Sequence, residues 1–301
     1  MGSGYTSIFL EDGWAHEKYY GWRLIYRAAG HKVLRKRYGP FARLLILSTD
    51  SSDSALSQML HQQRSGKWLT AISIHDFSAL RDDVPTVAGR RFTREDPEDT
   101  LLNTATIVLD LTQSHEVLET KLGQASRHKL RSAQKLGVHA ETLDPPDDQL
   151  LSDFYDFYVP LAQRFKLQIP EREVLSQMAH NGDLFAVRCQ DSSQRTLMVN
   201  LIYRASPTHA IFLYGARRPG KYPAGAGLLA HWTAALYLKA ALTHWYDLGG
   251  IVSTSLDDGI YRFKKSLGGD VVDLGSEFLS LPLSMKLVLR TREVLNSIRG
   301  M

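Results

Sequence analysis

Apolar residues in the second half of the chain form three short runs separated by turn residues. Runs of this kind are typical of an antiparallel meander. They cover residues 183–189, 196–204 and 209–216. Helical spacing precedes them at about residues 149–165 and 171–180, and a glycine-rich turn after them opens a long helix that leads to a strand ending at Asp247. This succession predicts a mixed α+β layered protein.

The first half carries both helical and extended patterns. The expected elements are an early helix leading into a strand over residues 13–28, a helix over 50–66, strands over 68–74 and 105–111, and a helix over about 115–136. The acidic segment 141–148 contains a double proline and separates two apolar blocks. We therefore place a first domain at residues 1–145, joined by a carboxy-terminal amphipathic helix at about 284–301, and a second domain at residues 146–283.

Composition narrows the class of protein. The chain has 301 residues, 44% of them hydrophobic and 23% charged, which suits two ordinary domains. A single cysteine, Cys189, excludes an intramolecular disulfide and a zinc site built from cysteines. The amino terminus lacks the pattern of a signal peptide, and no run approaches the roughly 20 apolar residues that span a bilayer. We expect a cytoplasmic monomer without an integral membrane segment.

Positive charge is distributed unevenly along the chain. The net charge is only +4, but Arg127, Arg131 and Lys135 recur every four residues and therefore share one face of the helix over 115–136, with Lys129 beside them. A solvated face and a contact with phosphates both explain this pattern. A second basic group, Arg35 to Arg37, precedes a Gly-Pro turn and is either plain surface or an anion site.

The most specified stretch runs from residue 246 to 275 and contains Asp247, two Gly-Gly pairs and the run Gly-Ile-Tyr-Arg-Phe-Lys-Lys. It resembles the Fem family of non-ribosomal peptidyltransferases, whose signature joins an Asp-aromatic-Gly-Gly strand end to Gly-hydrophobic-Tyr-x-Phe-Lys-Lys-Gly-Phe. The segment over 109–141 and the Arg-Tyr-Gly-Pro turn also resemble that family. The segments that resemble the family lie between residues 37 and 275. The chain has Ser266 and Leu267 where the signature has Gly-Phe.

The resemblance implies two tandem GNAT-like (acyl-CoA N-acyltransferase-like) domains. It also implies transfer of an amino acid from aminoacyl-tRNA, as co-substrate, to a small-molecule or peptidyl acceptor amine, in modification of a peptidoglycan precursor or in natural-product biosynthesis. No further cofactor and no metal are expected, because an aminoacyl ester is already activated. The chain has no long charged insertion like the coiled-coil arm of some members, so contact with tRNA would fall to the domain surfaces.

The resemblance also suggests roles for individual residues. Lys264 matches the first lysine of the Phe-Lys-Lys run and is the candidate for stabilising an oxyanion or contacting the tRNA 3′ end; the alternative is a lysine that closes a strand and pairs with Asp247 or Asp270. Asp247 is a candidate proton acceptor, or else it caps a neighbouring turn. The acceptor-binding candidates are Lys36, Arg37, Arg172 and Tyr214, and the tRNA-binding candidates are Arg127, Lys129, Arg131, Lys135 and Lys265.

Two other classes remain open. An acyl-CoA-dependent N-acyltransferase would hold a pyrophosphate at the glycine turn Gly225-Ala226-Gly227, which Arg217, Arg218 and Lys221 precede, although Tyr222 stands where a basic residue would be expected. A non-enzymatic nucleic-acid or envelope-associated binding module would explain the basic helix and leave the Phe-Lys-Lys run unexplained. The sequence contains no P-loop, nucleophile elbow or helical zinc motif.

Overall fold

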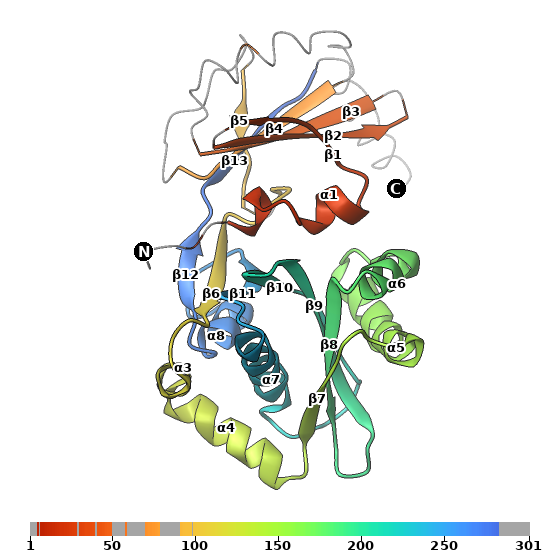
Figure 1. Ribbon diagram of the computed structural model, residues 1–301, viewed down its shortest axis with the longest axis vertical. Helices are drawn as coiled ribbons and strands as arrows, with labels where there is room; N and C mark the ends of the chain where they lie inside the picture. The colour runs from red at the N-terminus through yellow and green to blue at the C-terminus, as the bar shows by residue number, and fades with distance from the viewer. Residues whose placement is uncertain are drawn as a thin grey trace, which may run out of the picture. The chain divides into compact units, whose positions relative to one another are not determined.

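The computed structural model describes residues 5, 7–28, 30–39, 41–49, 58, 70–78, 91–97 and 99–282. Contacts divide the chain into two compact units (Figure 1). Unit 1 contains residues 1–15 and 106–272, and unit 2 contains residues 16–105 and 273–301. The helices expected over residues 50–66, apart from Gln58, and over 284–301 lie outside the described residues.

Unit 1 is built around a seven-stranded mixed sheet with the strand order β12-β6-β11-β10-β9-β8-β7. Its strands are β6 (Ala105–Asp110), β7 (His139–Leu143), β8 (Leu184–Gln190), β9 (Thr196–Ser206), β10 (His209–Arg217), β11 (Trp245–Ile251) and β12 (Asp270–Asp273). Its helices are η1 (Ile8–Leu10), α3 (His115–Lys121), α4 (Gly123–Lys135), α5 (Asp148–Phe165), α6 (Arg172–His180), α7 (Ala226–Ala240) and α8 (Gly259–Lys265).

Helices cover both faces of this sheet. Helix α7 packs on β7, β8 and β9 and is itself covered by α4, whereas α5 and α6 lie on the opposite face, with α5 against β9 and β10 (Figure 1). Strands β8, β9 and β10 pair in antiparallel succession, which confirms the predicted meander. Helices α5 and α6 begin and end within one residue of their predicted bounds.

The sheet opens between β10 and β11. These parallel strands are paired only where His209, Ala210 and Ile211 face Trp245, Tyr246 and Asp247. Beyond that point β10 continues to Arg217 along β9, and β11 continues to Ile251 without a partner in β10. A bulge in β10 after Phe212 shifts its register against β9 at the same level. The two strands therefore diverge, and the residues after Ile211 border an opening in the sheet.

Unit 2 has a six-stranded sheet in the order β1-β2-β3-β4-β13-β5, preceded by the short helix α1 (Ala15–Tyr19). Its strands are β1 (Arg23–Ala28), β2 (His31–Tyr38), β3 (Phe41–Ser48), β4 (Thr70–Asp76), β5 (Thr93–Arg94) and β13 (Ser276–Ser280). The core on this sheet is aliphatic and aromatic, and it includes Val33, Ile46, Ile74 and Phe278. Strand β13 comes from the far end of the chain and pairs with β4, so distant segments complete one sheet.

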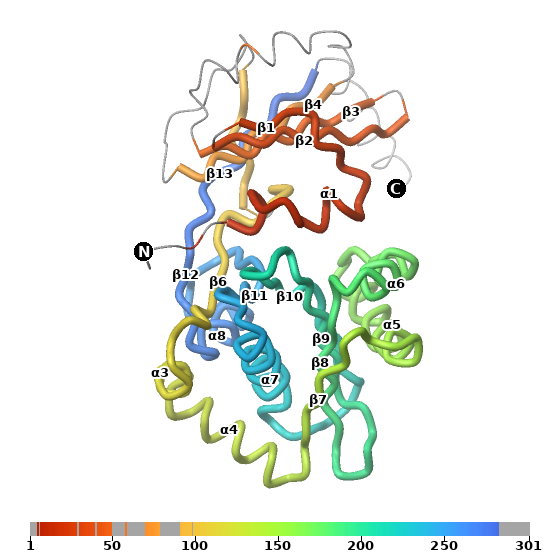
Figure 2. The backbone as a smooth tube through the Cα atoms, viewed as in Figure 1, coloured from red at the N-terminus to blue at the C-terminus, as the bar shows by residue number. Residues whose placement is uncertain are grey.

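Two sequence expectations differ from this architecture. The proposed domain boundary near residue 145 falls inside unit 1, because β7 before it pairs with β8 after it from His139 to Leu143. The same expectation placed β6 in the first domain, but β6 belongs to unit 1, where it lies between the distant strands β11 and β12 (Figure 2).

The second difference is the helix expected over 115–136, which is divided into α3 and α4 at Leu122.

Candidate active site

Lys264 lies on helix α8, and its side chain reaches back to strand β11. Asp258 caps this helix, since its Oδ1 accepts hydrogen bonds from the backbone N–H groups of Ile260 and Tyr261 at 2.7 and 2.9 Å. From the last turn, Lys264 Nζ donates to the carbonyl oxygens of Gly249 and Gly250 at 2.9 and 2.8 Å. The alternative of a strand-closing lysine paired with an aspartate is therefore wrong; its partners are two carbonyl groups.

The environment of Lys264 weakens its hold on a proton. Burial lowers the pKa of its ammonium group from 10.5 to about 8, although the carboxylates of Asp247 and Asp258 act in the opposite direction. The group still carries its charge for the most part at neutral pH. An ammonium has three N–H donors, and two of them are directed at the carbonyl groups of β11. No hydrogen bond of the third donor is found among the described residues.

Glycine is required at position 249. Its φ of 80° lies in the left-handed region that residues with a Cβ avoid. A Cβ there would also stand 3.3 Å from the carbonyl oxygen of Phe212 and 3.4 Å from Lys264 Nζ. The first Gly-Gly pair thus shapes the end of β11 so that its carbonyl groups face the lysine.

Asp247 lies within β11 rather than at its end, and only 2% of it is exposed. Its oxygens accept hydrogen bonds from Thr106 Oγ1, from the Gly249 N–H at 2.7 Å and from Tyr5 Oη at 3.1 Å. Burial raises the pKa of its carboxyl group, while these donors pull that pKa back down. It is absent from the residues lining the pocket described below. This geometry favours the turn-capping interpretation, and the proton-acceptor role stays a prediction.

Lys264 borders a pocket of about 470 Å³ in unit 1. The walls are mainly apolar and come from α5, β9, β10, α7 and α8, where the strands β10 and β11 diverge. The apolar and aromatic lining residues are Tyr158, Leu161, Leu167, Met198, Phe212, Leu213, Tyr214, Ala216, Ile260 and Phe263. The polar side chains in the lining are those of Asn200, Arg217, His231 and Lys264. A mostly apolar pocket with a few convergent polar groups is typical of a small-molecule site.

His231 of α7 brings a neutral imidazole to this pocket. Its Nδ1 forms a hydrogen bond of 2.9 Å with Tyr246 Oη, and its ring packs edge-on against Phe212 and Phe263. Burial, and then the nearby charge of Lys264, lower the pKa of the imidazole from 6.5 to about 3. It therefore stays uncharged at neutral pH. The available signal in the sequence was a histidine within a mainly apolar helix.

The two remaining acceptor-binding candidates of unit 1 have different surroundings. Tyr214 lines the pocket and packs edge-on against Tyr158, with ring centroids 5.5 Å apart. Arg172 is exposed at the start of α6, where its guanidinium lies 5.8 Å from the ring of Tyr155 and donates to the carbonyl of Asp148 at 3.3 Å. It is not among the residues that line the pocket.

Lys36 and Arg37 belong to β2 in unit 2, so they lie in a strand, and the turn begins after Tyr38. Lys36 Nζ stands 5.4 Å from the ring centroid of Tyr38, and Arg37 is exposed. In β3 their register partners are Arg43 and Ala42. Their role in binding an acceptor stays a prediction.

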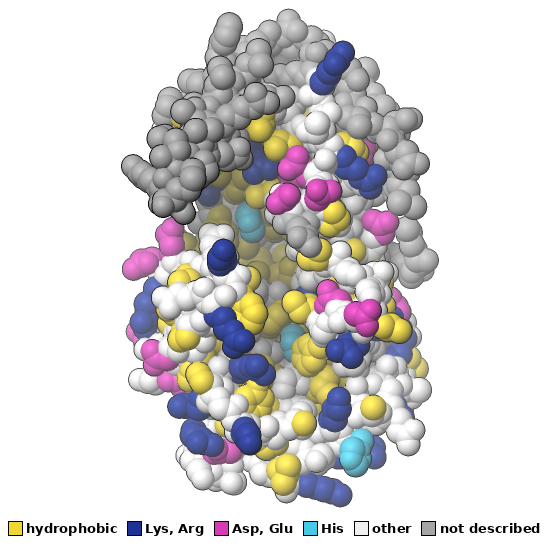
Figure 3. Space-filling model, turned by 180° about the vertical axis from the view of Figure 1, so that it is seen from behind, with side chains coloured by type: hydrophobic (Ala, Val, Ile, Leu, Met, Phe, Trp, Pro, Cys, Tyr) yellow, Lys and Arg dark blue, Asp and Glu magenta, His cyan; other side chains and the backbone are white. Residues whose placement is uncertain are grey.

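The tRNA-binding candidates divide into groups held by the protein and groups that project from it. Arg127 Nη1 donates to the last carbonyls of α3, at 2.9 Å to Glu119, and Arg131 pairs with the Glu119 carboxylate at 3.5 Å. Lys265 Nζ donates to the Gly269 carbonyl at 2.8 Å. Lys129 and Lys135 are exposed on α4. Unit 1, in the lower part of Figure 3, displays lysine and arginine side chains interspersed with hydrophobic ones.

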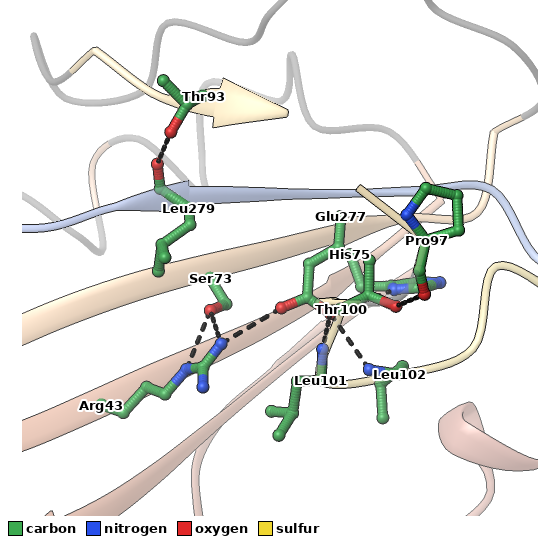
Figure 4. A network of polar contacts seen from close by, with 10 residues as sticks. All are labelled: Arg43, Ser73, His75, Thr93, Pro97, Thr100, Leu101, Leu102, Glu277 and Leu279. Carbon is green, nitrogen blue, oxygen red and sulfur yellow. Dashed lines mark hydrogen bonds and ion pairs between the residues drawn. The ribbon is translucent and has the colours of Figure 1, made fainter. Parts of the chain in front are cut away.

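A separate polar cluster in unit 2 was not singled out from the sequence (Figure 4). Glu277 of β13 is 1% exposed, and its Oε1 accepts a hydrogen bond from Arg43 Nη2 at 3.2 Å. Its Oε2 accepts from the backbone N–H groups of Leu101 and Leu102 at 2.8 and 3.1 Å. Since both oxygens of the buried carboxylate have donors, this cluster ties β13 to β3 and to the segment before β6.

Metal-binding clusters and membrane spans are both missing from the described residues. These residues contain no group of His, Cys, Asp and Glu side chains arranged to hold a metal ion. Each helix in the described part of the chain is too short or too polar to cross a membrane.

No protein-family model and no curated protein matches the sequence. Solved structures do resemble the chain. A crystal structure of FemX aligns with 92% of this chain and 93% of its own, at 16% identity and a TM-score of 0.62. The chain has a FemX-like fold. A structure of L-PGS from Bacillus licheniformis aligns with 90% of this chain and 88% of its own, at 13% identity and a TM-score of 0.57. The mixed α+β fold class predicted from the sequence is confirmed, and the GNAT-like character of the two units stays a prediction.

Proposed function

We propose that the chain is an aminoacyltransferase, which moves an amino acid from aminoacyl-tRNA to an acceptor amine and so forms an amide bond. The observation that carries the proposal is Lys264, a largely buried ammonium group beside the pocket with one N–H left for a ligand. The FemX-like fold and the resemblance of the stretch over 246–275 to the Fem signature support it. The acceptor amine belongs to a peptidoglycan precursor or to a natural product.

The reaction needs little chemistry from the protein. The neutral acceptor amine attacks the ester carbonyl carbon, a C–N bond forms, and the carbonyl oxygen becomes an oxyanion. The C–O bond to the ribose then breaks, and the proton lost by the amine ends on the ribose hydroxyl. A fixed donor aimed at the developing oxyanion lowers the barrier because it needs no reorganisation during the reaction. Lys264 is the group in the pocket that is suited to this role.

The binding assignments keep the distribution found in the sequence. We propose Tyr214, which lines the pocket, as an acceptor-binding residue of unit 1. Arg172 of unit 1, and separately Lys36 and Arg37 of unit 2, keep the acceptor-binding role that the resemblance implies, and their cationic groups suit an acceptor that carries phosphates. We assign the tRNA backbone to the basic surface of unit 1. Lys129 and Lys135 are its most available members, since Arg127, Arg131 and Lys265 also bind protein groups.

Transfer can be tested directly. The purified protein is incubated with a mixture of charged tRNAs and candidate amines, and the amide products are identified by mass spectrometry. We expect a product with the wild-type chain and a loss of about 100-fold or more in rate for Lys264→Ala. Arg195→Ala is the matched control, because Arg195 is an exposed residue whose carboxylate partner is Asp191. Turnover unchanged in Lys264→Ala would remove this lysine from the mechanism.

An acyl-CoA donor is the second candidate. Helix α7 begins at a glycine with no side-chain cap, so its first N–H groups suit a pyrophosphate. The two arginines before this helix give less support to a pyrophosphate site, because both already bind protein groups. Arg217 donates to Tyr222 Oη at 2.6 Å, and Arg218 donates to the Thr196 carbonyl at 2.6 Å. Titration calorimetry with acetyl-CoA separates the two donors, because tight stoichiometric binding would contradict the tRNA proposal.

A further inference from the structure

Asn200 of β9 is a buried amide without a hydrogen-bond partner. It is 0% exposed, and neither its Oδ1 nor its Nδ2 is bonded to any described residue. Buried polar groups in folded proteins almost always have partners, because burial deprives them of water. A side chain that could make several hydrogen bonds and makes none with the protein therefore suggests that its partner is a ligand.

The surroundings of Asn200 place this amide at the pocket. Asn200 lines it together with Met198 of the same strand and Phe212 of β10. Its register partner in β10 is Gly215. A Cβ at Gly215 would stand 3.0 Å from Asn200 Oδ1 and 2.8 Å from the ring of Phe212. Only glycine fits at position 215, so no side chain from that position covers the amide.

The charges around the amide restrict what it can bind. The lining contains no aspartate or glutamate, and it contains the cationic groups of Lys264 and Arg217. His231 is neutral because its pKa is about 3. A positively charged group would find no counter-ion in this lining and would be repelled by Lys264. A largely apolar group without positive charge and with one hydrogen-bonding function fits both the walls and the amide.

We propose that this pocket receives the side chain of the transferred amino acid and that Asn200 hydrogen-bonds to its polar group. The enzyme then selects an uncharged side chain that bears a hydroxyl or amide function over an apolar side chain of the same shape. This assignment rests on the proposed aminoacyl transfer. Selection of this kind is strong because an apolar analogue leaves the buried amide unpaired, whereas a purely apolar pocket hardly discriminates against an added hydroxyl.

Matched donors test the assignment. Transfer rates are compared for tRNAs charged with Tyr and Phe, with Thr and Val, and with Asn and Leu, using the wild-type chain and Asn200→Leu. We expect the wild-type chain to favour the polar member of at least one pair by about tenfold or more, and Asn200→Leu to abolish that preference. Met198→Leu changes the same wall without removing the amide and should keep the ratio. Equal ratios in wild type and Asn200→Leu would overturn the assignment.

A binding measurement separates this inference from the proposed function. Stable 3′-aminoacylamino-adenosines of the same six amino acids are titrated calorimetrically into the wild-type chain and Asn200→Leu. A polar preference in binding that Asn200→Leu loses, without any transfer from tRNA, would support the pocket and refute the reaction. Transfer without a polar preference would support the reaction and refute the assignment of the pocket. The absence of both binding and transfer would refute both proposals. The melting temperature of Asn200→Leu, expected to equal or exceed that of wild type, excludes misfolding as the cause.

Discussion

The ionisation of Lys264 can be measured without knowing the substrate. Burial lowers the pKa of its ammonium group from 10.5 to about 8. That difference corresponds to about 3 kcal/mol of free energy by which the folded environment disfavours the charged form. Two hydrogen bonds to carbonyl groups hold the charged form in place despite this cost. The lysine should therefore become nucleophilic at a lower pH than an ordinary lysine.

Competitive labelling measures this directly. The protein is treated with trace amounts of a small acylating reagent between pH 6 and pH 11, and the modification of the peptide carrying Lys264 is quantified by mass spectrometry. We expect its half-maximal reactivity near pH 8, and near pH 10.4 for the same lysine in the denatured protein. A midpoint near pH 10 in the folded protein would refute the account of a desolvated ammonium group.

The same shift affects stability and rate. Between about pH 8 and 10.5 the folded chain binds fewer protons at Lys264 than the unfolded chain, so the unfavourable contribution is complete below pH 8 and disappears as the pH rises. If the protonated lysine stabilises the oxyanion, kcat/KM should fall above about pH 8. Lys264→Arg stays charged there, so whatever activity it retains should not show this fall. An identical pH profile in both proteins would show that the ionisation of Lys264 does not cause the fall in kcat/KM.

Three further variants test residues of the site and of the basic surface. Gly249→Ala should lower the free energy of unfolding by about 1–2 kcal/mol, measured by urea denaturation, because the residue has a φ of 80°. Asp247→Asn should destabilise the fold by about 1–3 kcal/mol by mispairing its donors. If Asp247 caps the turn, kcat per folded molecule stays within about tenfold, whereas a drop of 100-fold or more would identify a base. Replacing Lys129 and Lys135 by glutamate should weaken tRNA binding in filter assays and lower the slope of log K against log salt by about 1–2.

The sequence predicts well the elements that have a clear period or strong punctuation. Strands β8 to β10 are short apolar runs separated by turn residues, and α5 and α6 have helical spacing and appear within one residue of their expected bounds. The importance of the stretch over 246–275 is also visible, because glycine pairs beside an acid and two lysines are unusual in a plain loop.

Other features depend on contacts that no local pattern records. Helix α8 is too short to show a helical period, so the sequence left open that Lys264 closes a strand. Asp258, which caps the helix, was the available signal that a helix begins there. Gly123 was the corresponding signal for the break between α3 and α4. The two units are discontinuous along the sequence, since β6 lies between β11 and β12, two strands from the far end of the chain. Asn200 lies in an apolar strand, and only the structure shows that its amide borders a pocket and has no hydrogen-bond partner among the described residues.

The pocket supplies a charge but no base for the acceptor amine. His231 lines it, yet with a pKa of about 3 its imidazole is not in the acidic imidazolium form at neutral pH, and it binds a proton too weakly to remove one from an amine. Asp247 has donors at both carboxylate oxygens and lies outside the lining. Lys264 is mainly protonated. In the proposed aminoacyl transfer with Asp247 as a turn cap, the amine would reach the ester already neutral, and its proton would pass to the ribose oxygen within the substrates or through water. On this proposal the site would act by holding two substrates together and stabilising one oxyanion, which is sufficient for an ester that is already activated.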